Sequence, residues 1–102
     1  MKRVAILGST GSVGRSALDV AAHLGLEVAG LAAGSNAKEL HAQILRHRPA
    51  RAALADPTAC DVLQKLMNGS STRLLRGAEG VREVASAEDV DVVLCAISGA
   101  AG

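Results

Sequence analysis

The amino-acid sequence predicts an α/β domain built on a doubly wound parallel β-sheet, and three observations support this prediction. Short apolar runs alternate with stretches of helical periodicity along all 102 residues. The apolar runs have hydrophobic residues at consecutive positions, which is typical of strands that helices cover on both faces. The first run, Val4 to Leu7, enters a turn with Gly8, Gly11 and Gly14, and a helical pattern follows at once. Together these features indicate a three-layer, Rossmann-type α/β/α arrangement.

The first elements are predicted as strand, helix and strand. The opening strand covers Arg3–Leu7, the helix Ser12–Leu24 and the next strand Leu26–Ala32. Gly25 is the expected stop of the helix, because glycine readily adopts the left-handed conformation that ends helices. The apolar side of this helix, which is expected to face the sheet, consists of Val13, Ala17, Val20, Ala21 and Leu24.

The middle of the chain is predicted to form helix, strand and helix. Asn36 is the expected N-cap of a helix that continues to about Arg48, before Pro49. A strand at Arg51–Ala55 follows, and Asp56-Pro57 then starts a helix that stops at Asn68-Gly69. In the first of these helices the residues expected to be buried are Ala37, Leu40, Ile44 and Leu45.

The last predicted elements are a strand at Thr72–Arg76, a short helix at Gly80–Ser86 and a strand at Val90–Ile97. Right-handed crossovers between parallel strands favour the strand order 3-2-1-4-5. We expect residues 1–102 to form one domain of a longer protein, because the sequence stops inside what looks like a functional loop of small residues. The residues of the short helix expected to point inward are Val81, Val84 and Ala85.

Composition and charge argue against several classes of function. Eleven basic and ten acidic residues give a formal net charge of +1, so no strong field attracts nucleic acid or an anionic membrane. The chain has no Phe, Tyr or Trp and therefore no aromatic platform for stacking bases. No apolar run approaches the roughly 20 residues of a membrane span. Cys60 and Cys95 fit no metal-ligand spacing and are expected to be reduced thiols in a cytoplasmic protein, with Cys95 buried in its strand.

A dinucleotide site is expected at the carboxyl ends of the strands, where the strand order reverses. The loops predicted there are 8–14, 34–36 and 98–102, and all three are rich in Gly, Ser and Ala. Glycine lets the backbone approach a pyrophosphate without a Cβ in the way, and the start of the following helix attracts negative charge. Similar glycine turns also occur in folds that bind other nucleotides or no ligand, so agreement between the loops carries more weight than the first motif alone.

The end of the second strand favours NADP(H) over NAD(H). An NAD site usually has Asp or Glu there to bind the ribose 2′-hydroxyl. This chain has Gly34, Ser35 and Asn36 instead, with Lys38 close by. A hydroxyl, an amide and the free N–H groups of a helix start can bind a 2′-phosphate, which a carboxylate would repel. Asn36 has a second interpretation as a plain helix cap, and Lys38 as a surface charge.

The sequence lacks a recognisable catalytic centre. Its acidic residues are scattered, and no Ser-His-Asp grouping surrounds Thr10 or Ser12. Capping or phosphate contact is the expected role of these two hydroxyls. The residues therefore predict cofactor binding without the machinery for chemistry.

Three segments of the chain form a more specific signal than any one motif. They are 6–14 with Ser16, Leu18, Asp19 and Val20 after it, then 33–36, and 96–102. Together they resemble the N-terminal domain of the 1-deoxy-D-xylulose 5-phosphate reductoisomerase family. The resemblance implies an NADPH-dependent oxidoreductase of the non-mevalonate isoprenoid pathway. Such an enzyme rearranges its sugar phosphate and reduces the product to 2-C-methyl-D-erythritol 4-phosphate, with Mg²⁺ or Mn²⁺.

Matching positions assign cofactor contacts to the three segments. Residues 10–13 would contact the pyrophosphate and the adjoining ribose, 34–36 the adenosine 2′-phosphate, and 96–102 the nicotinamide half. Many family members have a basic residue where this chain has Ser35, so a weaker grip on the 2′-phosphate is expected. The cofactor-binding residues expected from the loops and the resemblance are Gly8, Thr10, Gly11, Ser12, Val13, Gly34, Ser35, Asn36, Ala96 and Ile97.

The resemblance also implies what this chain leaves to the rest of its parent protein. The family's metal ligands, substrate-phosphate residues and lid lie downstream of residue 102, and the parent is expected to be a homodimer. This chain alone is expected to bind NADPH without catalysing a reaction. Two alternatives stay open: the N-terminal domain of a semialdehyde-type NADP dehydrogenase, and a non-enzymatic NADP-sensing module.

Overall fold

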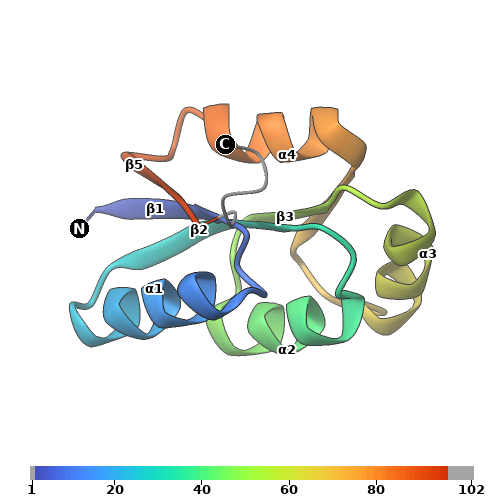
Figure 1. Cartoon of the computed structure of the whole chain (residues 1–102), viewed down its shortest axis with the longest axis horizontal. Helices are drawn as coiled ribbons and strands as arrows, with labels where there is room; N and C mark the ends of the chain where they lie inside the picture. The colour runs from blue at the N-terminus through green and yellow to red at the C-terminus, as the bar shows by residue number, and fades with distance from the viewer. Residues whose placement is uncertain (1, 97–102) are drawn as a thin grey trace.

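The structure, a computed structural model, describes residues 2–96 as a five-stranded sheet with helices around it (Figure 1). All neighbouring strands pair in parallel. This confirms the predicted α/β class and the parallel sheet. In chain order the elements are β1 (Arg3–Leu7), α1 (Ser12–His23), β2 (Glu27–Ala33), α2 (Ala37–His47), β3 (Arg51–Leu54), α3 (Pro57–Leu66), β4 (Arg73–Arg76), α4 (Gly77–Ser86) and β5 (Val92–Cys95).

The strand order is β4-β3-β2-β1-β5, which agrees with the predicted order over β3-β2-β1. The strand beside β1, where the predicted order has its fourth strand, is β5. The chain's own fourth strand, β4, instead extends the sheet beyond β3. Successive crossovers through α1, α2 and α3 carry the chain outward in one direction, and α4 then returns it to the other side of β1. The sheet is therefore doubly wound about β1.

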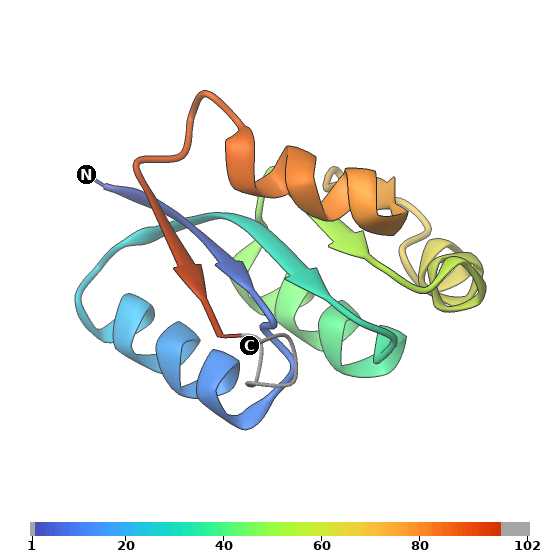
Figure 2. The same cartoon turned by 45° about the horizontal axis from the view of Figure 1, so that its top comes forward.

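Helices α1 and α2 cover one face of the sheet and α4 covers the other, as both views show (Figures 1 and 2). Because side chains alternate along a strand, Val4 and Ile6 pack in one cluster and Ala5 in the other. The larger cluster holds most of the buried Leu and Ile side chains, each worth about 1.5–3 kcal/mol when fully buried. The cluster beneath α4 is mostly alanine. A Cβ at Gly30 would lie 2.8 Å from Val84 Cγ1, so α4 lies very close to the sheet.

The buried side of α1 differs from the prediction. Gly14, Leu18 and Ala21 are the buried residues. Val13 and Leu24, both predicted to face the core, are 63% and 64% exposed. Val20, also predicted inward, is exposed as well. The prediction was wrong because α1 lies near the edge of the sheet: its apolar side borders a shallow groove beside β5, whose Val92 and Leu94 form the other wall.

Two further residues depart from the predicted burial. On α2, Gln43 is buried while Leu45 is exposed. Leu45 comes directly after the buried Ile44 in sequence and therefore lies outside the buried face of the helix. Cys95 is exposed, contrary to the prediction, since β5 has a neighbouring strand on one side only. Cys60 is buried.

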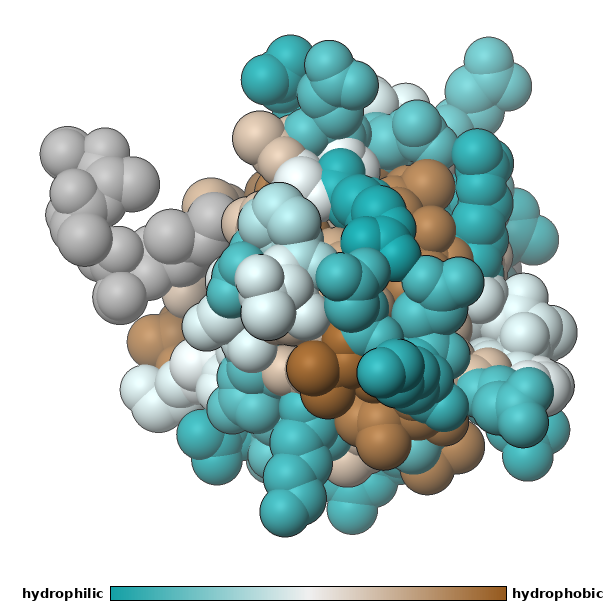
Figure 3. All heavy atoms as spheres, turned by 90° about the vertical axis from the view of Figure 1, so that its right-hand side faces the viewer, coloured by the Kyte–Doolittle hydropathy of each residue, from teal (hydrophilic) through white to brown (hydrophobic). Residues whose placement is uncertain are grey.

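The opposite edge of the sheet carries charge. Arg73 and Arg76 stand at the two ends of β4, and Arg76 pairs with Asp61 of α3 at 2.8 Å. Such charges discourage the pairing of a further strand. Figure 3, which views the molecule from the side of α3, shows mainly hydrophilic side chains with apolar surface between them. The exposed apolar residues of α3 include Val62 and Leu66.

A titratable group ends α2. His47 is partly buried, and this burial lowers the pKa of its imidazole below the ordinary value of 6.5. The neighbouring charge of Arg46 lowers the pKa further, while Asp19 opposes the change. The neutral form of His47 is therefore favoured in the folded chain.

We expect acid to destabilise the chain through His47. Because its folded-state pKa lies below the unfolded value, the unfolded chain binds the proton more readily. The free energy of unfolding should fall as pH decreases through 6.5 toward the folded-state pKa, with no further loss below it. Urea denaturation at about pH 7.5 and about pH 5 checks this. His47→Gln should reduce the difference, whereas His23→Gln, at an exposed position of α1, should retain it.

Candidate functional site

The turn between β1 and α1 is held by backbone hydrogen bonds. The amides of Gly8 and Ser9 donate to the carbonyl of Ala32 at 2.7 and 3.0 Å, and the amide of Gly11 donates to the carbonyl of Gly8 at 3.2 Å. Gly8 has a φ of 81°, a conformation that glycine adopts without strain. The turn is therefore fixed to the carboxyl end of β2. We call residues 8–14 the glycine loop.

The glycines of this loop serve different purposes. A Cβ at Gly14 would lie 2.0 Å from the carbonyl oxygen of Gly8, so α1 can approach the turn only without a side chain there. A Cβ at Gly11 would lie 3.6 Å from the same oxygen, an ordinary contact. Gly11 is exposed and faces a groove. The fold thus requires Gly8 and Gly14, while Gly11 keeps the outer surface of the loop open.

The first turn of α1 has no side-chain cap. Gly11 is its N-cap, and no side chain accepts a hydrogen bond from the first amides of the helix. By contrast, α2 is capped by Asn36 and α3 by Asp56, whose side chains accept from backbone amides. Uncapped N–H groups together with the helix dipole make the start of α1 suitable for an anion.

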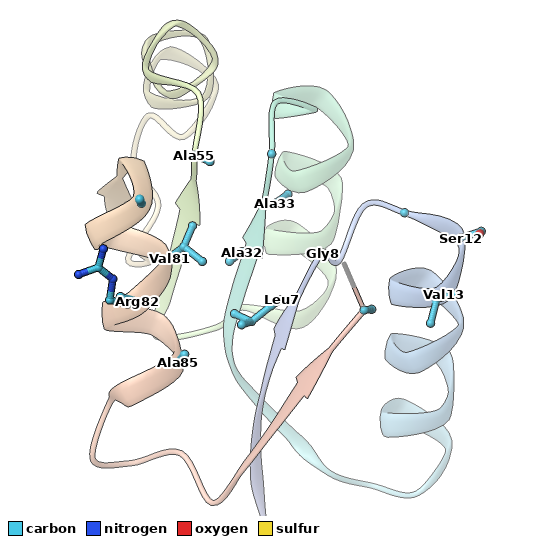
Figure 4. Close-up of a pocket in the computed structure, with 14 residues that line it drawn as sticks. Leu7, Gly8, Ser12, Val13, Ala32, Ala33, Ala55, Val81, Arg82 and Ala85 are labelled. Carbon is cyan, nitrogen blue, oxygen red and sulfur yellow. The ribbon is translucent and has the colours of Figure 1, made fainter. Parts of the chain in front are cut away.

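A groove lies along the carboxyl ends of the strands, between the glycine loop and α4 (Figure 4). Its cavity volume of about 720 Å³ is in the range of small-molecule sites. Leu7 and Ala32 form its floor, and Val81 of α4 stands opposite the loop. Most of the lining is apolar or backbone, as is usual for small-molecule sites.

The structure brings together most of the residues predicted from the sequence. Those that line the groove are Gly8, Gly11, Ser12, Val13, Gly34 and Ala96. Thr10 lies partly buried within the loop, and Ser35 and Asn36 are exposed immediately after Gly34. Ile97 and residues 98–102 lie outside the described residues, so the structure places neither that predicted contact nor the third predicted loop.

Asn36 acts as a helix cap. Its Oδ1 accepts a hydrogen bond from the amide of Glu39 at 3.1 Å, which confirms the capping interpretation. The side-chain amide of asparagine also carries two N–H donors, and the cap does not use them. Capping and anion contact are therefore compatible at this residue.

One wall of the groove was missed by sequence reasoning. Ala78, Val81, Arg82 and Ala85 of α4 all line it, and Arg82 is the only charged residue among the described lining residues. The missing signal was the strand order. Because β4 lies outside β3, α4 has to cross back over the sheet and thereby reaches the groove.

The described residues hold no evident centre for acid–base or metal chemistry. Between residues 2 and 96, no three His, Cys, Asp or Glu side chains gather closely enough to hold a metal ion. Within the same range, no carboxylate or imidazole lines the groove. The arrangement can bind and orient a ligand but offers it no proton donor from these groups.

No helix in the described part is long and apolar enough to cross a membrane.

The family profile of 1-deoxy-D-xylulose 5-phosphate reductoisomerase matches residues 4–102. The chain belongs to this family. A reductoisomerase from Anaeromyxobacter sp. (strain K) is 48% identical over 104 residues, which cover 100% of this chain and 26% of the relative. The chain thus spans about a quarter of the length of the curated reductoisomerases it matches.

Solved reductoisomerases have the same fold. A structure in complex with magnesium matches 100% of this chain and 26% of its own, with 34% identity and a TM-score of 0.92. The enzyme from Zymomonas mobilis in complex with NADPH matches 82% of this chain and 23% of its own, with 35% identity and a TM-score of 0.77. The topology described above, including the position of β5 beside β1, is therefore that of reductoisomerases.

We expect Gly14→Ala to destabilise the chain by about 3 kcal/mol, the upper part of the usual range for overpacking. The added Cβ would meet the backbone of the preceding turn, which cannot move without losing its bonds to Ala32. Urea denaturation followed by circular dichroism measures the change. Gly11→Ala is the matched control and should cost about 1 kcal/mol or less. Similar losses in both variants would contradict the packing role of Gly14.

Proposed function

We propose that residues 1–102 form the NADPH-binding domain of a 1-deoxy-D-xylulose 5-phosphate reductoisomerase. The observation that carries this proposal is the glycine loop, which keeps Gly11 and the uncapped start of α1 open toward the groove. The Zymomonas mobilis relative in complex with NADPH, which shares this fold, supports it. We assign the pyrophosphate and the adjoining ribose to Thr10, Gly11, Ser12 and Val13.

We propose that the adenosine 2′-phosphate lies against residues 34–36. The amides of Ala37 and Glu39 already donate to Ser35 and Asn36. The amide of Lys38 and the hydroxyl of the exposed Ser35 are suitable donors, and no described groove residue is acidic. Arg82 on the opposite wall adds positive charge to the groove. These features favour NADPH over NADH, because a carboxylate at this position would select the free 2′-hydroxyl.

The nicotinamide half is assigned to Ala96 and Ile97. Ala96 lines the groove at the end of β5, beside the turn after β1. The cofactor supplies a hydride, and the contribution of this domain is to hold and orient it. The described residues do not fit a divalent metal, so we assign Mg²⁺ or Mn²⁺, the sugar-phosphate substrate and catalysis to the rest of a parent protein. We propose that this parent is a cytoplasmic homodimer.

The family match favours this function over both alternatives drawn from the sequence. The reductoisomerase profile covers 4–102, nearly the whole chain. The semialdehyde-type alternative was drawn from the opening glycine pattern, which covers a small part of that match.

Calorimetric titration of the chain with NADPH and with NADH tests the proposal. We expect NADPH to bind at least about tenfold more tightly, a difference of about 1.4 kcal/mol. Gly11→Asp should abolish binding of both, because its carboxylate enters the space assigned to the pyrophosphate. Equal affinities for the two cofactors would overturn the preference for NADPH. If the folded chain bound neither, the assignment of the glycine loop would be wrong.

Ser35→Asp tests the position of the 2′-phosphate. We expect the variant to bind NADPH about tenfold more weakly through charge repulsion, while NADH binds equally well or better. Ser35→Ala is the control and should lose only the hydroxyl, with a smaller effect. The ratio of the two dissociation constants is the quantity to compare. A ratio that Ser35→Asp leaves unchanged would place the 2′-phosphate elsewhere.

A further inference from the structure

Gln43 is a buried polar side chain for which the fold alone gives no reason. It lies in the middle of α2 and is 5% exposed. Its Nε2 donates to the carbonyl oxygen of Ser9, in the glycine loop, at 2.8 Å. Its Oε1 and the hydroxyl of Ser9 are both buried without a partner in the described structure. Unpartnered buried groups cost about 1–3 kcal/mol each, so an apolar residue at position 43 would suit packing better.

The bond to Gln43 fixes the direction of a peptide group in the loop. In a planar trans peptide, the carbonyl of one residue and the N–H of the next point in opposite directions. The carbonyl of Ser9 points toward α2, so the N–H of Thr10 points away from it. Among the described residues, this N–H donates to no backbone carbonyl. It is a free donor beside Gly11, the exposed glycine of the loop.

The same helix serves the other half of the groove. Helix α2 begins after Asn36, directly behind the segment 34–36, and Gln43 lies about two turns further along. One rigid element therefore contacts the glycine loop through Gln43 and carries the segment assigned to the 2′-phosphate at its start.

We propose that Gln43 is a positioning residue for the cofactor. By holding the carbonyl of Ser9, it directs the amide of Thr10 toward the pyrophosphate. It also fixes the glycine loop relative to the segment 34–36, so that one ligand spans both. The proposal rests on the function proposed above, that this chain binds NADPH.

Gln43→Met tests this role, since methionine has a similar length and cannot donate a hydrogen bond. The matched control is Gln64→Met on α3, where an exposed glutamine accepts from Arg76 Nη2 at 2.6 Å. Binding of NADPH is compared with binding of 2′-AMP, which carries the 2′-phosphate without a pyrophosphate. We expect Gln43→Met to weaken the binding of NADPH by about tenfold and the binding of 2′-AMP by less than about twofold. The control should bind both ligands like the unmodified chain.

Amide hydrogen exchange in the free chain gives a readout that needs no cofactor. The amide of Ser9 donates to the carbonyl of Ala32 and the amide of Gly11 to that of Gly8. Both amides should exchange faster in Gln43→Met, while the other amides of β2 and those of β3 keep their rates. Gln43→Leu, which also removes the donor and leaves no unpartnered polar atom at position 43, should have the same effect and serves if the methionine variant does not fold.

The outcomes separate this inference from the proposed function. Unchanged exchange in the loop, or an equal loss of affinity for both ligands, would overturn the positioning role. If the unmodified chain bound neither ligand, both the proposed function and the cofactor role of Gln43 would be wrong. Faster exchange in the loop alone would then show only that Gln43 holds the loop.

Discussion

The close approach of Gly14 to the carbonyl of Gly8 determines the geometry at the carboxyl ends of the strands. A Cβ at Gly14 would meet the backbone of Gly8 and Ser9, so the uncapped start of α1 lies directly against the turn after β1. The turn itself is fixed to β2 through the carbonyl of Ala32, which receives two amides. The glycine loop is thereby fixed to the strand that leads into the segment 34–36. A single side chain at position 14 would disturb both.

The two faces of the sheet differ in the size of their side chains, and this difference shapes the groove. On the side of α1 and α2, Ile6 and Leu31 fill a thick layer. On the side of α4, the strands carry the short side chains of Ala5, Ala32 and Ala53, so α4 packs close to the sheet. Its residues Val81 and Arg82 then reach the edge of the site. Small side chains on β1, β2 and β3 thus decide what stands opposite the glycine loop.

Local patterns predicted the strands, the helices and the glycine loop, since each depends on residues close together in sequence. The positions of β4 and α4 were not predictable in this way. The residues of Arg73–Arg76 do not indicate with which strand β4 pairs in the sheet. The buried face of α1 was also wrong: periodicity identifies an apolar side such as Val13 and Val20, but not whether the sheet extends far enough to cover it. Gln43 had no sequence signal, since its partner is a backbone carbonyl 34 residues away.

The pairing of β5 with β1 has a consequence for how the chain folds during synthesis. Next to this pairing, the amide of Arg3 in β1 donates to the carboxylate of Asp91, the residue before β5, 88 residues away in sequence. Strands β1 to β4 can associate as they leave the ribosome, but β1 keeps an unpaired edge until Val92–Cys95 has emerged. Closing so long a loop is slow. One edge of β1 therefore stays unpaired while the residues before β5 are synthesised, and a chaperone would protect it best during that time.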